Sequence, residues 1–101
     1  MWAQMLKTRM KPGQEDTAQQ LPQEMEERFR NMGGGGPQRV VVMQDQHNPD
    51  EYYTLIFFES EEQARQFENG PQQQAIQQRM MQIWEGPPEY TDLNVVFDIT
   101  R

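Results

Sequence analysis

Apolar residues recur along this chain with two different periods, and the changes of period predict its elements. Four stretches have the alternating or continuous apolar pattern of β-strands: residues 2–11, 39–44, 51–59 and 91–100. The last of them alternates regularly through Leu93, Val95, Phe97 and Ile99. We therefore expect four strands, with the second and third joined by a short turn as an antiparallel hairpin.

One long helix is predicted over residues 17–32, between the first two strands. Its apolar residues recur at steps of three and four, which places them on one face: Ala18, Leu21, Met25, Phe29 and Met32. Glu24 precedes Arg28 by four residues. Glu26 precedes Arg30 by the same spacing, so we expect two ion pairs along this helix.

A second helical region follows the third strand and divides into two pieces. Ser60 and Gln63 form a capping box, in which side chains and backbone at the start of a helix hydrogen-bond reciprocally. The break at Asn69, Gly70 and Pro71 ends that helix and begins another. The apolar face of the second piece is expected to comprise Ile76, Met80, Ile83 and Trp84.

The resulting element order is β-α-β-β-α-β. This order is typical of the α+β ferredoxin-like fold, a four-stranded antiparallel sheet with helices on one face. A length of 101 residues suits one domain and is too short for two ordinary ones. We therefore expect a single domain over residues 1–101.

Four consecutive glycines, Gly33 to Gly36, lie between the predicted long helix and the second strand. A phosphate-binding glycine loop has the opposite order, because it follows a strand and opens a helix whose N–H groups face the anion. This run ends a helix instead. We therefore expect a helix C-cap with left-handed glycines, followed by a turn.

Two of the predicted strands are apolar on both faces. Residues 40–43 are Val-Val-Val-Met, and residues 55–58 are Leu-Ile-Phe-Phe. A sheet with helices on one face and solvent on the other normally alternates between apolar and polar residues. A second copy of the same sheet is the simplest cover for the other face, so we expect a homodimer packed sheet to sheet.

The net charge of −7 limits the classes of partner. An acidic surface repels phosphate groups, so we expect neither nucleic-acid nor anionic-membrane binding. The N-terminus lacks a signal-peptide core, and no apolar stretch approaches the ~18 residues of a membrane span. Cysteine is absent, which excludes disulfides, thiolate zinc sites and a cysteine nucleophile. We expect a cytoplasmic protein.

The layout of the chain resembles the dimeric α/β-barrel superfamily, and within it the antibiotic-biosynthesis-monooxygenase-like family. The resemblance is carried by "KPG" at the end of the first strand, by glycines between a helix and a strand, and by "YTLIFFESEEQARQFENGPQQQAI". It implies dimers formed through the sheets, with a pocket between helices and sheet in each subunit. Members include cofactor-free monooxygenases of aromatic compounds, haem-degrading enzymes and many small proteins of unassigned role.

The same resemblance argues against haem degradation. The haem-degrading branch has an Asn on its first strand, a Trp in the helix after its third strand and a His in the next helical piece. The matching positions here are Lys7 (or Leu6), Phe67 and Gln77. All three depart from that pattern, and glutamine is not an ordinary axial ligand of haem iron.

Candidate ligand contacts come from aromatic, methionine and arginine side chains. A flat apolar ligand would suit a cavity built from large apolar side chains, which equally form ordinary cores. The candidates are Arg9, Met25, Phe29, Tyr53, Phe67 and Trp84. Arg65 and Arg79 are further possible anchors for a ligand anion, although a surface ion pair explains each equally well.

His47 is the only histidine, and it lies in the predicted hairpin turn. A metal site with neighbouring carboxylates or a role as general base is conceivable, but a solvated loop residue is the simplest interpretation. We expect no metal and no cofactor. Two functions stay open: cofactor-independent monooxygenation of a small aromatic or apolar substrate, and a non-catalytic ligand-binding or structural homodimer.

Overall fold

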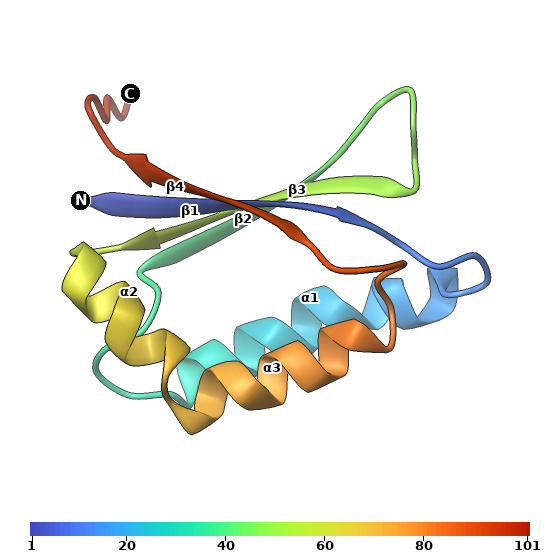
Figure 1. The fold of residues 1–101 in the computed structure, drawn as a ribbon, viewed down its shortest axis with the longest axis horizontal. Helices are drawn as coiled ribbons and strands as arrows, with labels where there is room; N and C mark the ends of the chain where they lie inside the picture. Colours follow the sequence, from blue (N-terminus) through green and yellow to red (C-terminus); the bar gives the residue numbers. More distant parts are fainter.

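The computed structural model describes residues 1–101 and contains four strands and three helices (Figure 1). Their bounds are β1 (Trp2–Arg9), α1 (Glu15–Arg30), β2 (Arg39–Gln44), β3 (Glu51–Phe58), α2 (Glu61–Glu68), α3 (Pro71–Met81) and β4 (Glu89–Asn94). The strands form one antiparallel sheet in the order β2-β3-β1-β4. The three helices lie on one side of that sheet (Figure 1). This is the α+β ferredoxin-like fold that the sequence predicts.

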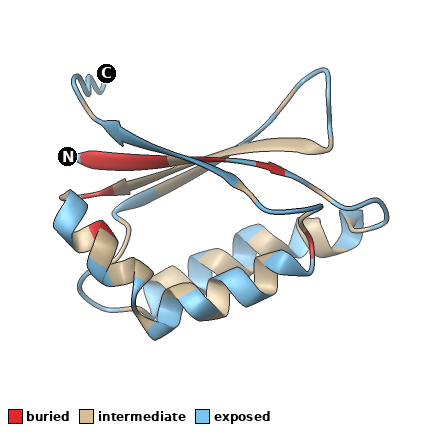
Figure 2. Ribbon diagram, viewed as in Figure 1, coloured by how far each residue is buried: buried red, intermediate tan, exposed pale blue.

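The core lies between the sheet and α2. Trp2, Phe58 and Ala64 form its buried centre, with exposed fractions of 6%, 3% and 0%. The rings of Trp2 and Phe58 lie 6.0 Å apart and tilted, and Phe67 of α2 packs 5.8 Å from Phe58. Figure 2 shows buried positions concentrated along β1. Side chains of β1, β3 and α2 therefore pack together to form the core.

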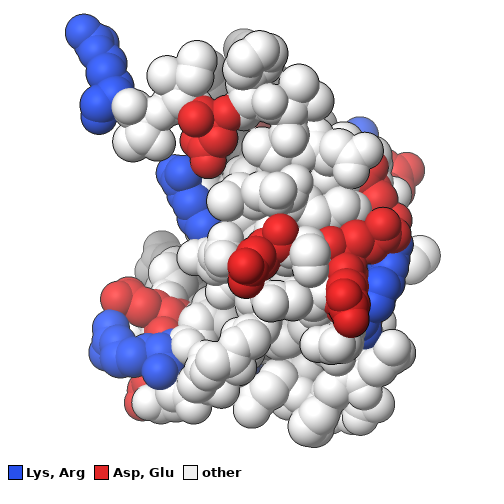
Figure 3. All heavy atoms as spheres, turned by 90° about the vertical axis from the view of Figure 1, so that its left-hand side faces the viewer, with Lys and Arg blue, Asp and Glu red and all other residues white.

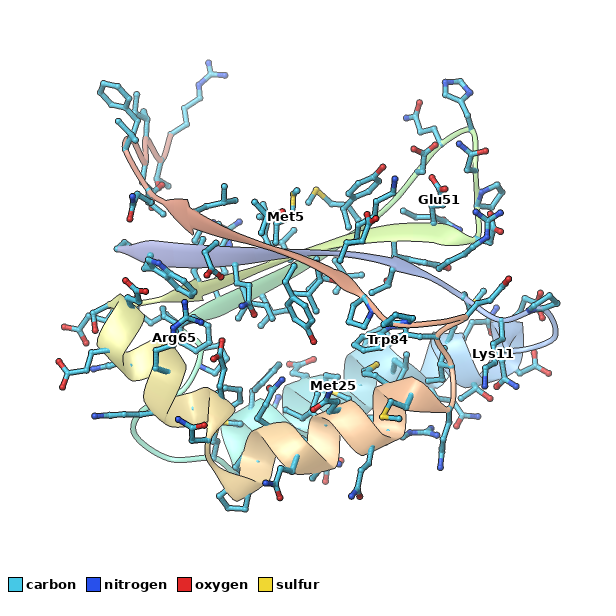
Figure 4. All side chains as sticks on the ribbon, in the orientation of Figure 1. Met5, Lys11, Met25, Glu51, Arg65 and Trp84 are labelled. Atoms are coloured by element: carbon cyan, nitrogen blue, oxygen red, sulfur yellow. The ribbon has the colours of Figure 1, made fainter.

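The two faces of the sheet follow from the contacts of Trp2. Side chains alternate along a strand, and Trp2 packs against α2, so Gln4, Leu6 and Thr8 also face the helices. Met5 points to the opposite side, away from the helices (Figure 4). We call that side the outer face. The register places on it the apolar residues Ala3, Met5, Val41, Met43, Tyr53, Leu55, Phe57 and Leu93.

The long helix α1 is close to the predicted range 17–32 but is displaced by two residues at both ends, running from Glu15 to Arg30. Four of the five residues of the predicted apolar stripe lie in α1 and are half-buried, while most other residues of α1 are exposed. The fifth, Met32, is half-buried just beyond the end of the helix. The Glu26–Arg30 pair forms, at 2.9 Å. The expected Glu24–Arg28 pair is wrong. Glu24 instead accepts two hydrogen bonds from Arg79 of α3, at 2.9 and 3.1 Å, because a bidentate contact is stronger than an exposed pair within one helix.

The capping box at the start of α2 is half confirmed. Ser60 Oγ accepts a hydrogen bond from the backbone N–H of Gln63 at 3.2 Å. The side chain of Gln63 donates to Glu59 at 3.2 Å instead of returning to the Ser60 backbone. One serine oxygen therefore satisfies an N–H group that the helix leaves free.

The glycine run follows a helix and contains left-handed glycines, as predicted, but the expected glycine cap is wrong. Asn31 caps α1, and Gly33, Gly35 and Gly36 have positive φ values of 78°, 82° and 83°. At Gly36 the requirement is steric as well, since a Cβ atom there would lie 2.7 Å from the Met32 sulfur. The run is a turn that carries the chain from α1 into β2.

The last strand is shorter than its apolar alternation predicts. β4 ends at Asn94, and the prediction that it continues to residue 100 is wrong. β1 begins at Trp2, opposite Asn94, and only one further hydrogen bond follows, from the Val95 N–H to the Met1 carbonyl at 3.2 Å. Beyond it no neighbouring strand remains. Val96, Phe97 and Ile99 are therefore 81%, 83% and 88% exposed.

Trp84 lies outside the helix to which the sequence assigned it. α3 ends at Met81, and Trp84 forms an isolated bridge with Met10, just beyond β1. The neighbouring Ile83 is buried, with 3% exposure. The chain after α3 is therefore tied to the end of β1 before it enters β4.

Candidate functional site

A cleft of about 360 Å³ opens between the sheet and the helices α2 and α3. Strands β1 and β4 form one wall, and the two helices form the other. We call it the polar cleft, because every side chain that lines it carries a nitrogen or oxygen atom. Its lining residues are Gln4, Arg65, Glu68, Gln73, Gln77, Tyr90 and Asp92. Large apolar side chains are expected from the sequence to line a ligand cavity, whereas the lining of this cleft is polar.

Gln4 connects two walls of the polar cleft. It lies on the helix-facing side of β1 with 9% exposure, between the buried residues Trp2 and Leu6. Its amide nitrogen donates to Glu68 of α2 at 3.3 Å and to Asp92 of β4 at 3.2 Å. Both amide hydrogens are thereby used, and the carbonyl oxygen remains available as an acceptor.

Arg65 is the only cation in the lining, and carboxylates surround it. Its guanidinium donates to Asp92 at 2.9 Å, to Glu68 at 3.0 Å and to Glu61 at 3.3 Å. It also lies 5.2 Å over the ring of Trp2, within the range of a cation–π contact. Figure 4 shows Arg65 between α2 and the sheet. The guanidinium is fixed in place by contacts within the chain.

Hydrogen bonds within this cluster shift the pKa values of Asp92 and Arg65. Hydrogen bonds from Arg65, and then from Gln4, lower the pKa of Asp92 below its ordinary value. Hydrogen bonds to Asp92 and Glu68 raise the pKa of Arg65. Both groups are therefore charged at neutral pH.

The pKa of Tyr90 is shifted upward, in contrast to that of Asp92. Burial of its hydroxyl, and then the negative charge of Glu68, raise the pKa of Tyr90 above its ordinary value. The phenol is neutral at physiological pH, and it forms no hydrogen bond with another residue. The amides of Gln73 and Gln77 on α3 are likewise free of partners within the chain. These three groups can therefore bind a ligand.

A second cavity, of about 300 Å³, lies beside the glycine turn. Its walls combine the turn with parts of α2 and the start of α3, and none of its residues is charged. They are Met32, Gly34, Gly35, Gly36, Gln63, Gln66, Phe67, Gly70 and Gln72. Figure 3 shows the α2 end of the molecule, where acidic and basic side chains lie beside one another on the surface.

The six candidate residues from the sequence do not gather in one place, and none of them lines the polar cleft. Phe67 lines the second cavity, beside the glycine turn, and packs on Phe58. Arg9 and Tyr53 belong to the outer face of the sheet. Arg9 pairs there with Asp50 at 2.8 Å and with Glu51 at 3.3 Å.

The remaining candidates lie in the helix layer. Met25 and Phe29 are half-buried on α1, and Trp84 follows α3. Figure 4 shows Met25 and Trp84 on the side of the helices that faces the sheet. Ligand binding by any of the six residues stays a prediction.

The residues of the polar cleft come from four separate elements, and only two of these residues, Gln4 and Arg65, are notable in the sequence. Gln4 is a polar residue between Trp2 and Leu6 on the helix-facing side of β1, which is unusual for a position with 9% exposure. Arg65 was a possible anchor for an anion. The structure instead shows its guanidinium occupied by three carboxylates.

The residues matched to the haem-degrading branch do not lie together, and the only histidine lies apart from the cleft. Lys7 is exposed on the outer face, 6.0 Å from the ring of Tyr53, whereas Gln77 lines the polar cleft. His47 is exposed in the turn between β2 and β3, where its backbone N–H donates to Asp45 at 2.8 Å. No group of three histidine or carboxylate side chains is close enough to hold a metal ion.

Fold and cleft together define a small ferredoxin-like protein with a ligand-sized opening between helices and sheet. The chain belongs to the antibiotic biosynthesis monooxygenase family, whose model matches residues 1–79. Among curated protein sequences, none matches this chain. No helix is long and apolar enough to cross a membrane.

Solved structures support the fold over nearly the whole chain. A protein of unknown function from Nitrosomonas europaea, NE2512, is similar with a TM-score of 0.76 at 15% identity, covering 99% of this chain and 93% of that one. Rv0793 from Mycobacterium tuberculosis has a TM-score of 0.74 at 12% identity, with 98% of each chain covered. A candidate antibiotic biosynthesis monooxygenase from Chloroflexus aurantiacus reaches 22% identity and a TM-score of 0.72, covering 98% and 96%.

Proposed function

We propose that this protein is a cofactor-independent monooxygenase that oxidises a small aromatic substrate in the polar cleft. The observation that carries the proposal is the family match over residues 1–79, together with an opening of about 360 Å³ between helices and sheet. That volume is in the range of small-molecule sites. We propose further that residues 1–101 act as one domain in the cytoplasm.

The chemistry needs no external reductant when the substrate supplies the electrons. A hydroquinone (C₆H₆O₂) and O₂ give a hydroxyquinone (C₆H₄O₃) and water. One oxygen atom forms a new bond to ring carbon, and the other leaves as water with two hydrogen atoms of the substrate. An anthrone reacts in the same sense, since its CH₂ group becomes a carbonyl and one water is released. The substrate would bind as the neutral phenol and lose a proton to water, and the anion so formed would transfer the first electron to O₂.

The role proposed for the protein is positioning and exclusion of water. The free amides of Gln73 and Gln77 and the hydroxyl of Tyr90 would orient the hydroxyl groups of the substrate. The hydrogen-bonded cluster of Arg65, Glu68 and Asp92 would hold the walls of the cleft in place. No role as general base is assigned to any residue.

We also propose that the active form is a homodimer joined through the outer faces of two sheets. The outer face carries eight apolar residues around Met5 and Leu55 that the helices do not cover. The segment after β4 adds Val96, Phe97 and Ile99, each more than 80% exposed. Burial of such surface is favourable by about 25 cal/mol per Å². A second copy of the chain offers a matching surface of the same kind.

A panel of hydroquinones and anthrones incubated with the protein, with and without O₂, tests the proposed activity. We expect enzyme-dependent product only in the aerobic samples, in amounts that match the O₂ consumed. A double variant, Gln73→Ala with Gln77→Ala, should raise KM, while Gln74→Ala, an exposed position of the same helix outside the cleft lining, should not. Equal product in aerobic and anaerobic samples would refute the proposal.

A second function, ligand binding without catalysis, is favoured by one observation. Oxygenation would depend on a substrate anion, and the carboxylates of Glu68 and Asp92 oppose an anion in the cleft. A ligand that binds in the cleft but neither consumes O₂ nor changes chemically would support this alternative.

A further inference from the structure

The polar cleft has an excess of negative charge. Its lining contains two carboxylates, Glu68 and Asp92, and one guanidinium, that of Arg65. Arg65 donates in addition to Glu61, so three carboxylates share one cation. No other lysine or arginine lines the cleft. An anionic ligand would therefore meet repulsion without a free positive partner.

The groups that remain free in the cleft suit hydroxyl groups rather than ions. The amides of Gln73 and Gln77 each offer both donors and an acceptor, and the Gln4 carbonyl offers an acceptor. Tyr90 adds a hydroxyl and an aromatic face. A phenolic hydroxyl, which donates one hydrogen bond and accepts others, can use all of these groups without bringing a charge.

Tyr90 shows what this environment does to a phenol. Its ring lies in the wall of the cleft, and burial together with the charge of Glu68 raises its pKa. A phenolic ligand beside it would meet the same carboxylate. The groups in the cleft wall and the raised pKa of Tyr90 therefore both favour a neutral phenol over an ionised one.

We infer that the polar cleft binds its aromatic ligand in the neutral, hydroxyl-bearing form and rejects carboxylated or otherwise anionic analogues, with Gln73, Gln77 and Tyr90 contacting the hydroxyl groups and Glu68 excluding anions. This inference rests on the proposed function only in taking the ligand to be aromatic. It makes Glu68 a residue that determines specificity through charge.

A matched pair of probes tests it: hydroquinone, which is neutral at pH 7, and 2,5-dihydroxybenzoate, the same ring with a carboxylate. Each is titrated without O₂ into ¹⁵N-labelled protein, and the side-chain NH₂ signals of Gln73 and Gln77 are followed by NMR. We expect hydroquinone to shift these signals and to bind at least about tenfold more tightly than the carboxylate, because the latter faces an uncompensated like charge. Equal affinity of the two probes, or no binding of either, would overturn the inference.

Two variants of α2 distinguish an effect of the Glu68 charge from a general effect of substitutions in this helix. Glu68→Gln should reduce the discrimination between the two probes several-fold. Glu62→Gln removes the same charge from an exposed position of the same helix, outside the cleft lining, and should leave the discrimination unchanged. Unchanged discrimination in Glu68→Gln, with hydroquinone still bound, would also overturn the inference.

The outcome is independent of turnover because both probes are studied without O₂. If hydroquinone binds selectively but no substrate is oxygenated in air, the proposed function fails and the inference stands. If oxygenation occurs but the carboxylated ring binds equally well, the inference fails and the function stands.

Discussion

Arg65 and Asp92 are separated by 27 residues in the sequence, yet the Nη2 and Oδ2 atoms of their side chains meet at 2.9 Å. The contact joins α2 to β4, the strand at one edge of the sheet. Gln4 of the neighbouring strand donates to the same carboxylate at 3.2 Å. One aspartate therefore holds together three elements that form the walls of the polar cleft.

The first prediction concerns acid stability. The pKa of Asp92 is lower in the folded protein than its value of about 3.9 in an unfolded chain. The contribution of Asp92 to the free energy of unfolding is therefore present above pH 4 and is lost as pH falls through the folded pKa. Asp92→Asn should lower the urea midpoint modestly at neutral pH, since both partners are over 40% exposed, and should flatten the acid side of the profile.

Asp98→Asn is the control, because Asp98 lies in the exposed segment after β4 and makes no ion pair. Its urea midpoint should follow the unsubstituted protein between pH 2 and pH 7. Identical profiles for the two variants would show that the contact between Arg65 and Asp92 does not contribute to stability in solution.

The second prediction concerns the glycine turn. Gly36→Ala should destabilise the protein by roughly 1–2 kcal/mol, because a side chain at positive φ is strained. The new Cβ would also lie 2.7 Å from the Met32 sulfur. Gly34→Ala is the matched control, since φ is not positive there and no atom lies within 4 Å of the added carbon. Equal urea midpoints for the two variants would contradict the conformation described for the turn.

The third prediction concerns the phenol in the cleft. In a titration followed by tyrosine NMR signals, the midpoint for Tyr90 should lie above that of an ordinary tyrosine, because partial burial, and then the negative charge of Glu68, disfavour the ionised phenol. Glu68→Gln should lower the midpoint of Tyr90 only in part, because burial is the larger cause. A midpoint unchanged by the substitution would show that the charge of Glu68 does not reach the hydroxyl.

The fourth prediction concerns assembly. Light scattering at micromolar concentration should give twice the monomer mass of 12.0 kDa. Phe57→Glu places a charge in the outer face and should shift the population to monomer. Val42→Glu places the same charge on the other face of the sheet, at a residue with 61% exposure, and should remain dimeric. A monomeric mass for the unsubstituted protein would contradict the proposed interface.

The sequence predicts correctly those features that depend on neighbouring residues, and it misses those that depend on residues far apart in the chain. The apolar stripe through Met25 and Phe29 predicted α1, since helical periodicity is local. The end of β4 at Asn94 depends on where β1 begins, which alternation within residues 91–100 does not encode. Likewise, Glu24 appeared to match Arg28 by spacing, but its partner Arg79 lies 55 residues away.

The polar cleft was hard to predict for the same reason. Its residues come from β1, α2, α3 and β4, and no local motif joins them. Glutamines are abundant on every helix, so Gln73 and Gln77 do not stand out from exposed neighbours such as Gln74 and Gln78. Only the fold brings these amides opposite Tyr90. Of the aromatic candidates, Phe67 packs on Phe58 in the core and Tyr53 lies on the outer face. Phe29 and Trp84 lie in the helix layer, so none of the four lines the cleft.

The most direct test of the central claim is the origin of the oxygen atom in the product. The protein is incubated with a hydroquinone under ¹⁸O₂, and the hydroxyquinone is analysed by mass spectrometry, with H₂¹⁸O under ordinary O₂ as the complementary sample. Monooxygenation without a cofactor predicts one labelled atom from ¹⁸O₂ in each product molecule, and none from water. Product that forms at the same rate without the protein, or whose new oxygen comes from water, would contradict it.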